Sequence, residues 1–186
     1  GLNQCGYEYC KGEAMAKNPK WTQSLEVWSD YFHKWISTAS QQDLIDISIY
    51  FDFRHIDGDV NLVNNLRNKL EEFTDGQSGF YQHLTRNCLL HKPPVGILGK
   101  LLLETKGEKA DKFDIKLATM PISDFARIYA LKNNLKDTNT LERLQSLFAK
   151  GILNKRTYEE IVQAYNFLMQ IRFRHQATQL TEEVPF

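Results

Sequence analysis

The residues best suited to chemistry lie in one segment of the first third of the chain. From Ile45 to Arg54 apolar and polar side chains alternate, which predicts a β-strand with one apolar face. Its polar face carries Asp46, Asp52 and Arg54. Carboxylate oxygens are the ligands that hard divalent ions prefer, and a planar guanidinium matches a phosphate group. The polar face therefore has groups that could meet a divalent ion or a phosphate, with a salt bridge from Arg54 to Asp52 or Asp59 as the structural alternative.

Other metal-binding patterns in the sequence are weaker. Asp57 and Asp59 have the spacing Asp-x-Asp, but they flank Gly58 in a predicted turn and are not assigned a metal. Cys5 and Cys10 have no second cysteine or histidine pair nearby, whereas a structural zinc site needs four ligands. Three cysteines are too few for a disulfide framework in a chain of this length, which favours reduced thiols and a cytoplasmic location.

The amino-acid composition limits the classes of protein to which the chain can belong. The chain has 186 residues, with 23 Lys and Arg against 23 Asp and Glu. Such a balance, with no run of basic residues, gives no reason to expect a nucleic-acid partner. No apolar run approaches the ~20 residues that cross a bilayer, so no membrane contact is predicted. The length fits one domain, or one domain with part of another.

Segments whose apolar residues have helical spacing precede and follow the predicted strand in the sequence. Apolar residues recur at helical intervals in 22–37, with Thr22 as the N-cap, and Ser40 with Asp43 has the spacing of a further cap. Helices are also predicted over 60–74 and 78–91. A second short strand is predicted at Gly6–Cys10.

The second half is predicted to be helical after an uncertain segment. For 96–118 a β-hairpin is preferred over a helix followed by a loop. Helices are predicted from Pro121 onward, at Asn139 with Glu142 as a cap, and at Thr157, where Glu160 completes a capping box. The predicted fold class is mainly α, a helical bundle with a small residual β element.

Five segments, in order, carry a resemblance to a known family. They are Gly6–Cys10 with Met15–Trp21, Tyr50–Arg54 with Gly58–Asp59, Phe113–Lys116 with Pro121–Ile122, Ala126–Leu131 with Asn139–Thr140 and Arg143–Leu144, and Arg172–Gln176. Together they resemble bacterial nucleotidyltransferases related to the uridylyltransferases that modify the PII signalling protein. Such enzymes often follow cyclic-nucleotide-binding and CBS domains in signal-transduction proteins.

The resemblance implies a division of the chain and a missing part. Residues 1–59 would be the C-terminal remnant of the nucleotidyltransferase domain, and 60–186 a helical substrate-binding domain. The family's Gly-Ser loop and the two metal-binding carboxylates after it are not found, so the chain is expected to be an excised segment. The β element would be the remainder of a truncated sheet, whose open edge we expect a helix, a crystal neighbour or a homodimer mate to cover.

The resemblance also assigns roles to residues. Asp52 would be the third carboxylate of a site that holds Mg²⁺ or Mn²⁺ in the intact enzyme, because Asp-Phe-Arg resembles the third-carboxylate strand of polymerase-beta-like enzymes. Substrate-binding positions would be Arg54, Asn18, Lys116, Arg127 and Arg172. The structural alternatives are a turn for Asn18 and ion pairs between helices for the basic residues.

Two functional classes remain open, beside a plain helical scaffold. In the first, the parent enzyme transfers a nucleoside monophosphate from a nucleoside triphosphate to a protein or small-molecule acceptor. In the second, the chain is a regulatory or protein-interaction module derived from this family. One carboxylate cannot hold two catalytic metals, so this chain by itself is expected to be inactive and to bind no metal.

Overall fold

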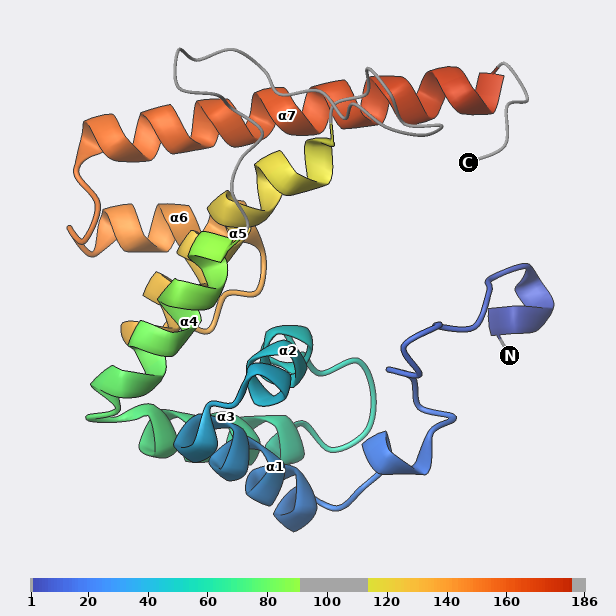
Figure 1. The fold of residues 1–186 in the computed structure, drawn as a ribbon, viewed down its shortest axis with the longest axis vertical. Coiled ribbons are helices and arrows are strands. Elements are labelled where there is room, and N and C mark those ends of the chain that lie inside the picture. The colour runs from blue at the N-terminus through green and yellow to red at the C-terminus, as the bar shows by residue number, and fades with distance from the viewer. Residues whose placement is uncertain (1, 91–113, 182–186) are drawn as a thin grey trace. The chain divides into compact units, whose positions relative to one another are not determined.

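A computed structural model describes residues 2–90 and 114–181, and every regular element in these ranges is helical (Figure 1). The mainly α fold class is therefore confirmed. The elements are two 3₁₀ turns and seven α-helices: η1 (Leu2–Cys5), η2 (Pro19–Trp21), α1 (Leu25–Thr38), α2 (Gln41–Tyr50), α3 (Val60–Thr74), α4 (Ser78–Leu90), α5 (Ile115–Lys132), α6 (Thr140–Ala149) and α7 (Lys155–Thr181).

The chain forms two compact units. The first comprises Gly1–Ile49 and His55–Asp75, and the second comprises Tyr50–Arg54 and Gly76–Phe186. Within the first unit α1 packs against α3, and within the second α5 packs against α4, α6 and α7. Apart from Tyr50–Arg54, the units divide after α3, because α3 packs on α1, and the expected boundary between family domains at 59/60 stays a prediction.

The predicted strand Ile45–Arg54 is wrong: this segment is the greater part of α2 and the turn after it. Leu44, Ile47 and Phe51, spaced as on one helical face, are buried, whereas Ile45 and Ile49 are 45% and 51% exposed. The start of α2 is fixed by the predicted cap, since Ser40 N donates to Asp43 Oδ2 at 3.1 Å and Asp43 N donates to Ser40 Oγ at 3.2 Å. This reciprocal cap favours an α-helix over the β-strand that the alternating pattern predicts.

The two other predicted β segments are also not strands where the structure describes them. Gly6–Cys10 is a turn followed by irregular chain. Ile115–Leu117, assigned to the hairpin, begins α5, because the Asp114 carboxylate accepts from Lys116 N at 2.8 Å and caps the helix. Residues 96–113 of the proposed hairpin lie outside the described residues.

An aromatic cluster dominates the first unit. Its members are Trp21, Trp28, Tyr31, Phe32 and Trp35, with neighbouring ring centroids 5.3–6.4 Å apart. Ser24, not Thr22, caps α1 by accepting from Val27 N. The cluster packs η2 onto α1, since Trp21 comes from the first element and the other four rings come from the second.

The second unit has its own apolar core. Ala126 of α5 packs with Leu144 and Leu147 of α6 and with Leu153, and the first three are fully buried. After α6 the chain turns at Gly151, whose φ is +71°, and α7 runs back alongside α6 (Figure 1). Of the two helix caps predicted for this part of the chain, one is confirmed and one is wrong. Asn139 caps α6 as expected, but Asn154 caps α7 in place of Thr157.

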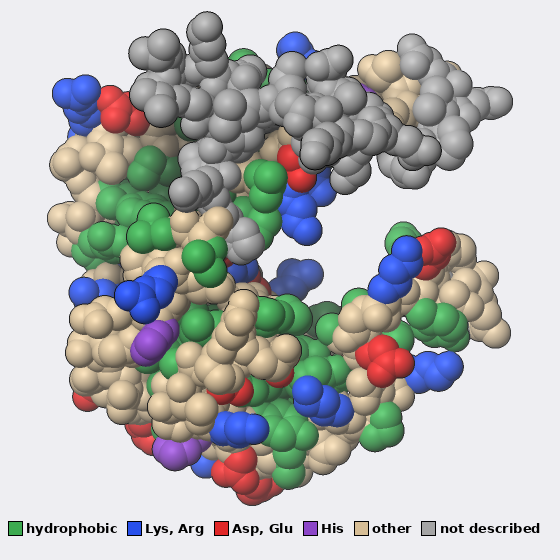
Figure 2. Space-filling view, in the orientation of Figure 1, with side chains coloured by type: hydrophobic (Ala, Val, Ile, Leu, Met, Phe, Trp, Pro, Cys, Tyr) green, Lys and Arg blue, Asp and Glu red, His purple; other side chains and the backbone are tan. Residues whose placement is uncertain are grey.

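The surface carries both signs of charge. Over the described residues of the face drawn in Figure 2, Lys and Arg side chains are interspersed with Asp and Glu. Among the described helices, none is both long enough and apolar enough to cross a membrane.

Candidate functional site

Asp52 is held by two arginines. It lies in the turn after α2, within the second unit, and both of its carboxylate oxygens accept hydrogen bonds. Arg127 of α5 donates to Oδ2 from Nη2 at 2.9 Å and from Nε at 3.3 Å. Arg143 of α6 donates from Nη2 to Oδ1. One carboxylate thus joins the turn to two helices of the second unit.

The two arginines have further partners that fix their orientation. Arg127 also pairs with Asp124, one turn earlier in α5, at 3.0 Å. Arg143 donates from Nε to the carbonyl of Asp137 at 2.7 Å. The Arg143 side chain is only 4% exposed, against 20% for Arg127 and 30% for Asp52. Asp52, Asp124, Arg127 and Arg143, called here the Asp52 cluster, therefore balance two positive charges with two negative ones.

The cluster changes the acidity of Asp52. Burial alone would raise the pKa of its carboxyl group, but the hydrogen bond from Arg143, together with the charge and hydrogen bonds of Arg127, outweighs burial and lowers that pKa. A lowered pKa means that the charged form is stabilised in the folded protein.

This acidity predicts a pH dependence of folding. The contribution of ionised Asp52 to the free energy of unfolding should be fully present above the unfolded-state pKa of about 3.9. It should be lost as pH falls through the pKa of Asp52 in the folded protein, which is lower. The difference in unfolding free energy between the wild type and Asp52→Asn should therefore be constant from neutral pH to about pH 5 and shrink at lower pH. Urea titrations at pH 7, 5, 4 and 3 measure it, with the exposed Asp57→Asn as the control. A difference that stays constant to pH 3 would contradict the role of the charge.

The surroundings of Asp52 do not suit a divalent metal ion. Both oxygens already accept from guanidinium groups, and two cationic side chains at the site would repel a cation. Across the described ranges, no group of three or more His, Cys, Asp or Glu side chains could hold a metal. Asp59, in the neighbouring Asp-x-Asp pattern, is engaged as the N-cap of α3. The assignment of Asp52 as a catalytic metal ligand stays a prediction, and the observed geometry favours an ion-pair role.

Of the predicted substrate-binding residues, only Arg127 meets Asp52. Arg54 is exposed in the turn, Lys116 is exposed in the first turn of α5, and Arg172 is exposed on α7. In the described parts of the chain, none of these three charged groups has an ion pair. Among the described residues, no ion pair therefore ties these three side chains to the Asp52 cluster, and their substrate roles stay predictions.

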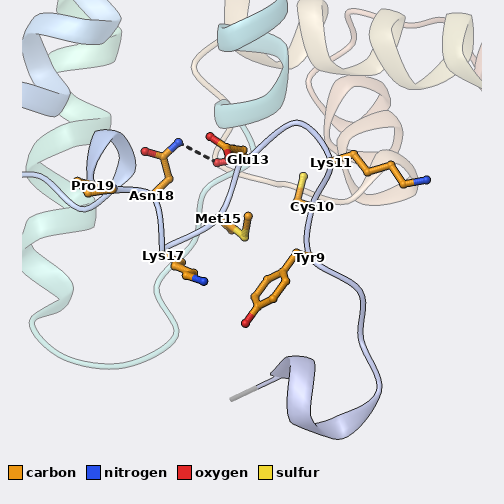
Figure 3. A pocket seen from close by; sticks show the side chains of 8 residues that line it. All are labelled: Tyr9, Cys10, Lys11, Glu13, Met15, Lys17, Asn18 and Pro19. Carbon is orange, nitrogen blue, oxygen red and sulfur yellow. Dashed lines mark hydrogen bonds between the residues drawn. The ribbon is translucent and has the colours of Figure 1, made fainter.

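Asn18 lies in a separate hollow of the first unit, with a volume of about 570 Å³, lined in part by Tyr9, Met15 and Lys17 (Figure 3). Its amide is used locally: Nδ2 donates to the carbonyl of Glu13 at 3.3 Å, and Oδ1 accepts from Lys20 N to cap η2. Lys17 lies over the ring of Tyr9 at 4.7 Å. The observed contacts of Asn18 are those of a turn residue, which was its structural alternative.

Two members of the cluster received no role from the sequence: Asp124 was not singled out, and Arg143 was named only within a family motif. The signal for Arg143 lies in its neighbours. This arginine lies in α6 beside Leu144 and four residues before Leu147, both fully buried. A basic residue on the apolar side of a helix needs a carboxylate partner, because an unpaired buried charge is costly. That position in the apolar pattern was the available signal.

Two family models match the chain. The one described as "Putative nucleotidyltransferase substrate binding domain" matches residues 78–185, more than half of the sequence. The one described as "Putative nucleotidyltransferase DUF294" matches residues 1–42. Searches among curated proteins and among solved structures found no match. The two models support a nucleotidyltransferase-like function in general terms.

Proposed function

This chain belongs to the family described as "Putative nucleotidyltransferase substrate binding domain", and on that premise we propose that its second unit binds a substrate of a nucleotidyltransferase. One observation carries the proposal. The family match begins at residue 78, where α4 begins, two residues after the second unit resumes at Gly76. The matched region is thus a folded unit with its own core, as a binding module requires.

The reaction proposed for the intact enzyme is transfer of a nucleoside monophosphate from a nucleoside triphosphate to a protein or small-molecule acceptor. The ordered motifs that resemble PII uridylyltransferases support this choice. Mg²⁺ or Mn²⁺ would stabilise the triphosphate in such a reaction. In this proposal those ions belong to carboxylates other than Asp52, because Asp52 is engaged by Arg127 and Arg143.

The proposed task of Asp52 is to anchor the connection between the two matched regions. Residues 50–54 lie between the match that ends at 42 and the match that begins at 78. Although Tyr50 is the last residue of α2 and the other four residues follow that helix directly, the segment belongs to the second unit. The ion pairs of Asp52 fasten this segment to α5 and α6, so it acts on substrate binding through position and not through contact with the reacting atoms.

The wider setting is proposed from the resemblance. It is a bacterial signal-transduction protein with CBS and cyclic-nucleotide-binding domains in the same chain, acting as a monomer or homodimer. A cytoplasmic location is supported by the three cysteines, which are all free.

A second candidate is a binding module without catalysis. The observation in its favour is the Asp52 cluster. Asp52 is the one carboxylate to which the resemblance gives a catalytic role, and here it is engaged in hydrogen bonds to Arg127 and Arg143. The two candidates predict different outcomes when the natural full-length protein is given labelled nucleotide.

A transfer assay distinguishes them. The natural full-length protein, with Mg²⁺ or Mn²⁺, should move label from α-³²P-UTP or another α-labelled nucleoside triphosphate to a PII-type protein or a small acceptor and release pyrophosphate. The 186-residue chain alone should give no turnover under the same conditions. Absence of transfer from all four nucleotides by the full-length protein would favour the non-catalytic module. Turnover by the 186-residue chain would contradict the proposal that this chain binds substrate and is inactive by itself.

A further inference from the structure

A groove between α4 and α5 has the residues of a ligand site. One side is formed by Ser78, Tyr81, Gln82, Thr85, Arg86 and Leu89, and the other by Ile128, Tyr129 and Lys132. The first set recurs at three- and four-residue intervals, so it forms one face of α4. The groove lies wholly within the second unit and has a volume of about 490 Å³. That volume is in the range of small-molecule sites.

The charge of the groove points to an anion. Arg86 and Lys132 lie on opposite sides, and the lining includes no Asp or Glu. In the described portion of the chain neither cation has an ion pair, unlike Arg127, Arg143 and Arg156. Two cations from separate helices, in one concave site, suit a phosphate group, to which arginine can donate two hydrogen bonds at once.

The rest of the lining suits a flat ring. Tyr81 and Tyr129 come from opposite sides, and the side chains of Tyr129 and Leu89 remain 40% and 69% exposed. Exposed aromatic and apolar groups beside cations favour a ligand with an anionic end and an aromatic end. The hydroxyl and amide groups of Ser78 and Gln82 add hydrogen-bonding capacity. A nucleoside phosphate has all three features.

We propose that the α4–α5 groove binds a nucleoside phosphate, with Arg86 and Lys132 on the phosphates and the tyrosines beside the base. The assignment of the groove to substrate binding rests on the proposed function, but the binding itself does not require catalysis. Because the lining lacks carboxylates, the phosphates are held by protein cations and not through a metal ion.

The test is direct binding of UTP to this chain in EDTA, by calorimetry. Saturable binding is expected, and Arg86→Ala and Lys132→Ala should each raise Kd about 10-fold or more, as loss of a charge-assisted hydrogen bond implies. Arg156→Ala is the matched control: it removes the same charge from a side chain that is 86% exposed on α7 and should leave Kd unchanged. Tyr129→Ala should weaken binding, whereas Tyr129→Phe should retain it.

Three results would overturn the groove assignment: no saturable UTP binding, unchanged Kd in both cation variants, or capture of an acidic peptide with which UTP does not compete. The outcome is separable from that of the transferase proposal. If UTP binds here but the full-length protein transfers nothing, the groove stands and the transferase fails. If transfer occurs while Arg86→Ala and Lys132→Ala leave Kd and KM unchanged, the transferase stands and the groove fails.

Discussion

Replacing Asp52 with asparagine is expected to lower the free energy of unfolding by about 3 kcal/mol. The substitution keeps the shape of the side chain but removes its charge. Arg143, whose side chain is only 4% exposed, would then be left without its carboxylate. Breaking a buried pair from one side is costly because the remaining charge cannot regain water. Urea unfolding followed by circular dichroism at neutral pH measures the effect.

Two comparisons show whether the effect belongs to the ion pair. Asp57→Asn removes the same charge from an exposed position in the same loop and should change stability by no more than about 0.5 kcal/mol. Combining Asp52→Asn with Arg143→Met should cost less than the sum of the single changes, because both remove one interaction. Strict additivity, or an Asp52→Asn loss no larger than that of Asp57→Asn, would show that the pair does not anchor the turn.

Replacing Phe32 with alanine should have the larger effect, about 4 kcal/mol, as for other fully buried aromatic residues. Phe32 is 1% exposed and packs against Trp28 and Trp35, with ring centroids 6.1 and 5.3 Å away. All three tryptophans of the chain belong to this cluster, so their emission reports directly on the first unit. Urea titration of tryptophan emission measures the loss.

Phe167→Ala is the control for this substitution. It removes the same ring from α7, where the side chain is 62% exposed, and should shift the urea midpoint little. Equal losses for the two variants would mean that the aromatic cluster is not the core of the first unit.

Much of the helical fold could be predicted because its caps are local. Asn139 marks the start of α6 in the sequence, and the Ser40–Asp43 pair marks the start of α2. The error at Ile45–Arg54 arose because this segment fits two periods at once. Alternating isoleucines suggest a strand, whereas Leu44, Ile47 and Phe51 share a helical face. Burial decides between the two patterns, and burial depends on residues distant in the sequence.

The candidate site was harder to predict than the helices. Asp52 and Arg127 were both singled out, but as separate ligands and not as partners, because 75 residues separate them. Arg143 is 91 residues from Asp52 and was named only within a family motif, without a partner, because sequence spacing does not show which distant carboxylate it meets. The α4–α5 groove was not predicted, since its lining depends on the register in which two helices pack.

The most direct test of the central claim, that the second unit binds a nucleotidyltransferase substrate, is to map amide shifts in the ¹⁵N-labelled chain as UTP is added. The account predicts saturable shifts concentrated in α4 and α5, around Arg86 and Lys132. Shifts confined to Gly1–Ile49 and His55–Asp75, or no saturable shift in the second unit with any nucleoside triphosphate, would contradict it.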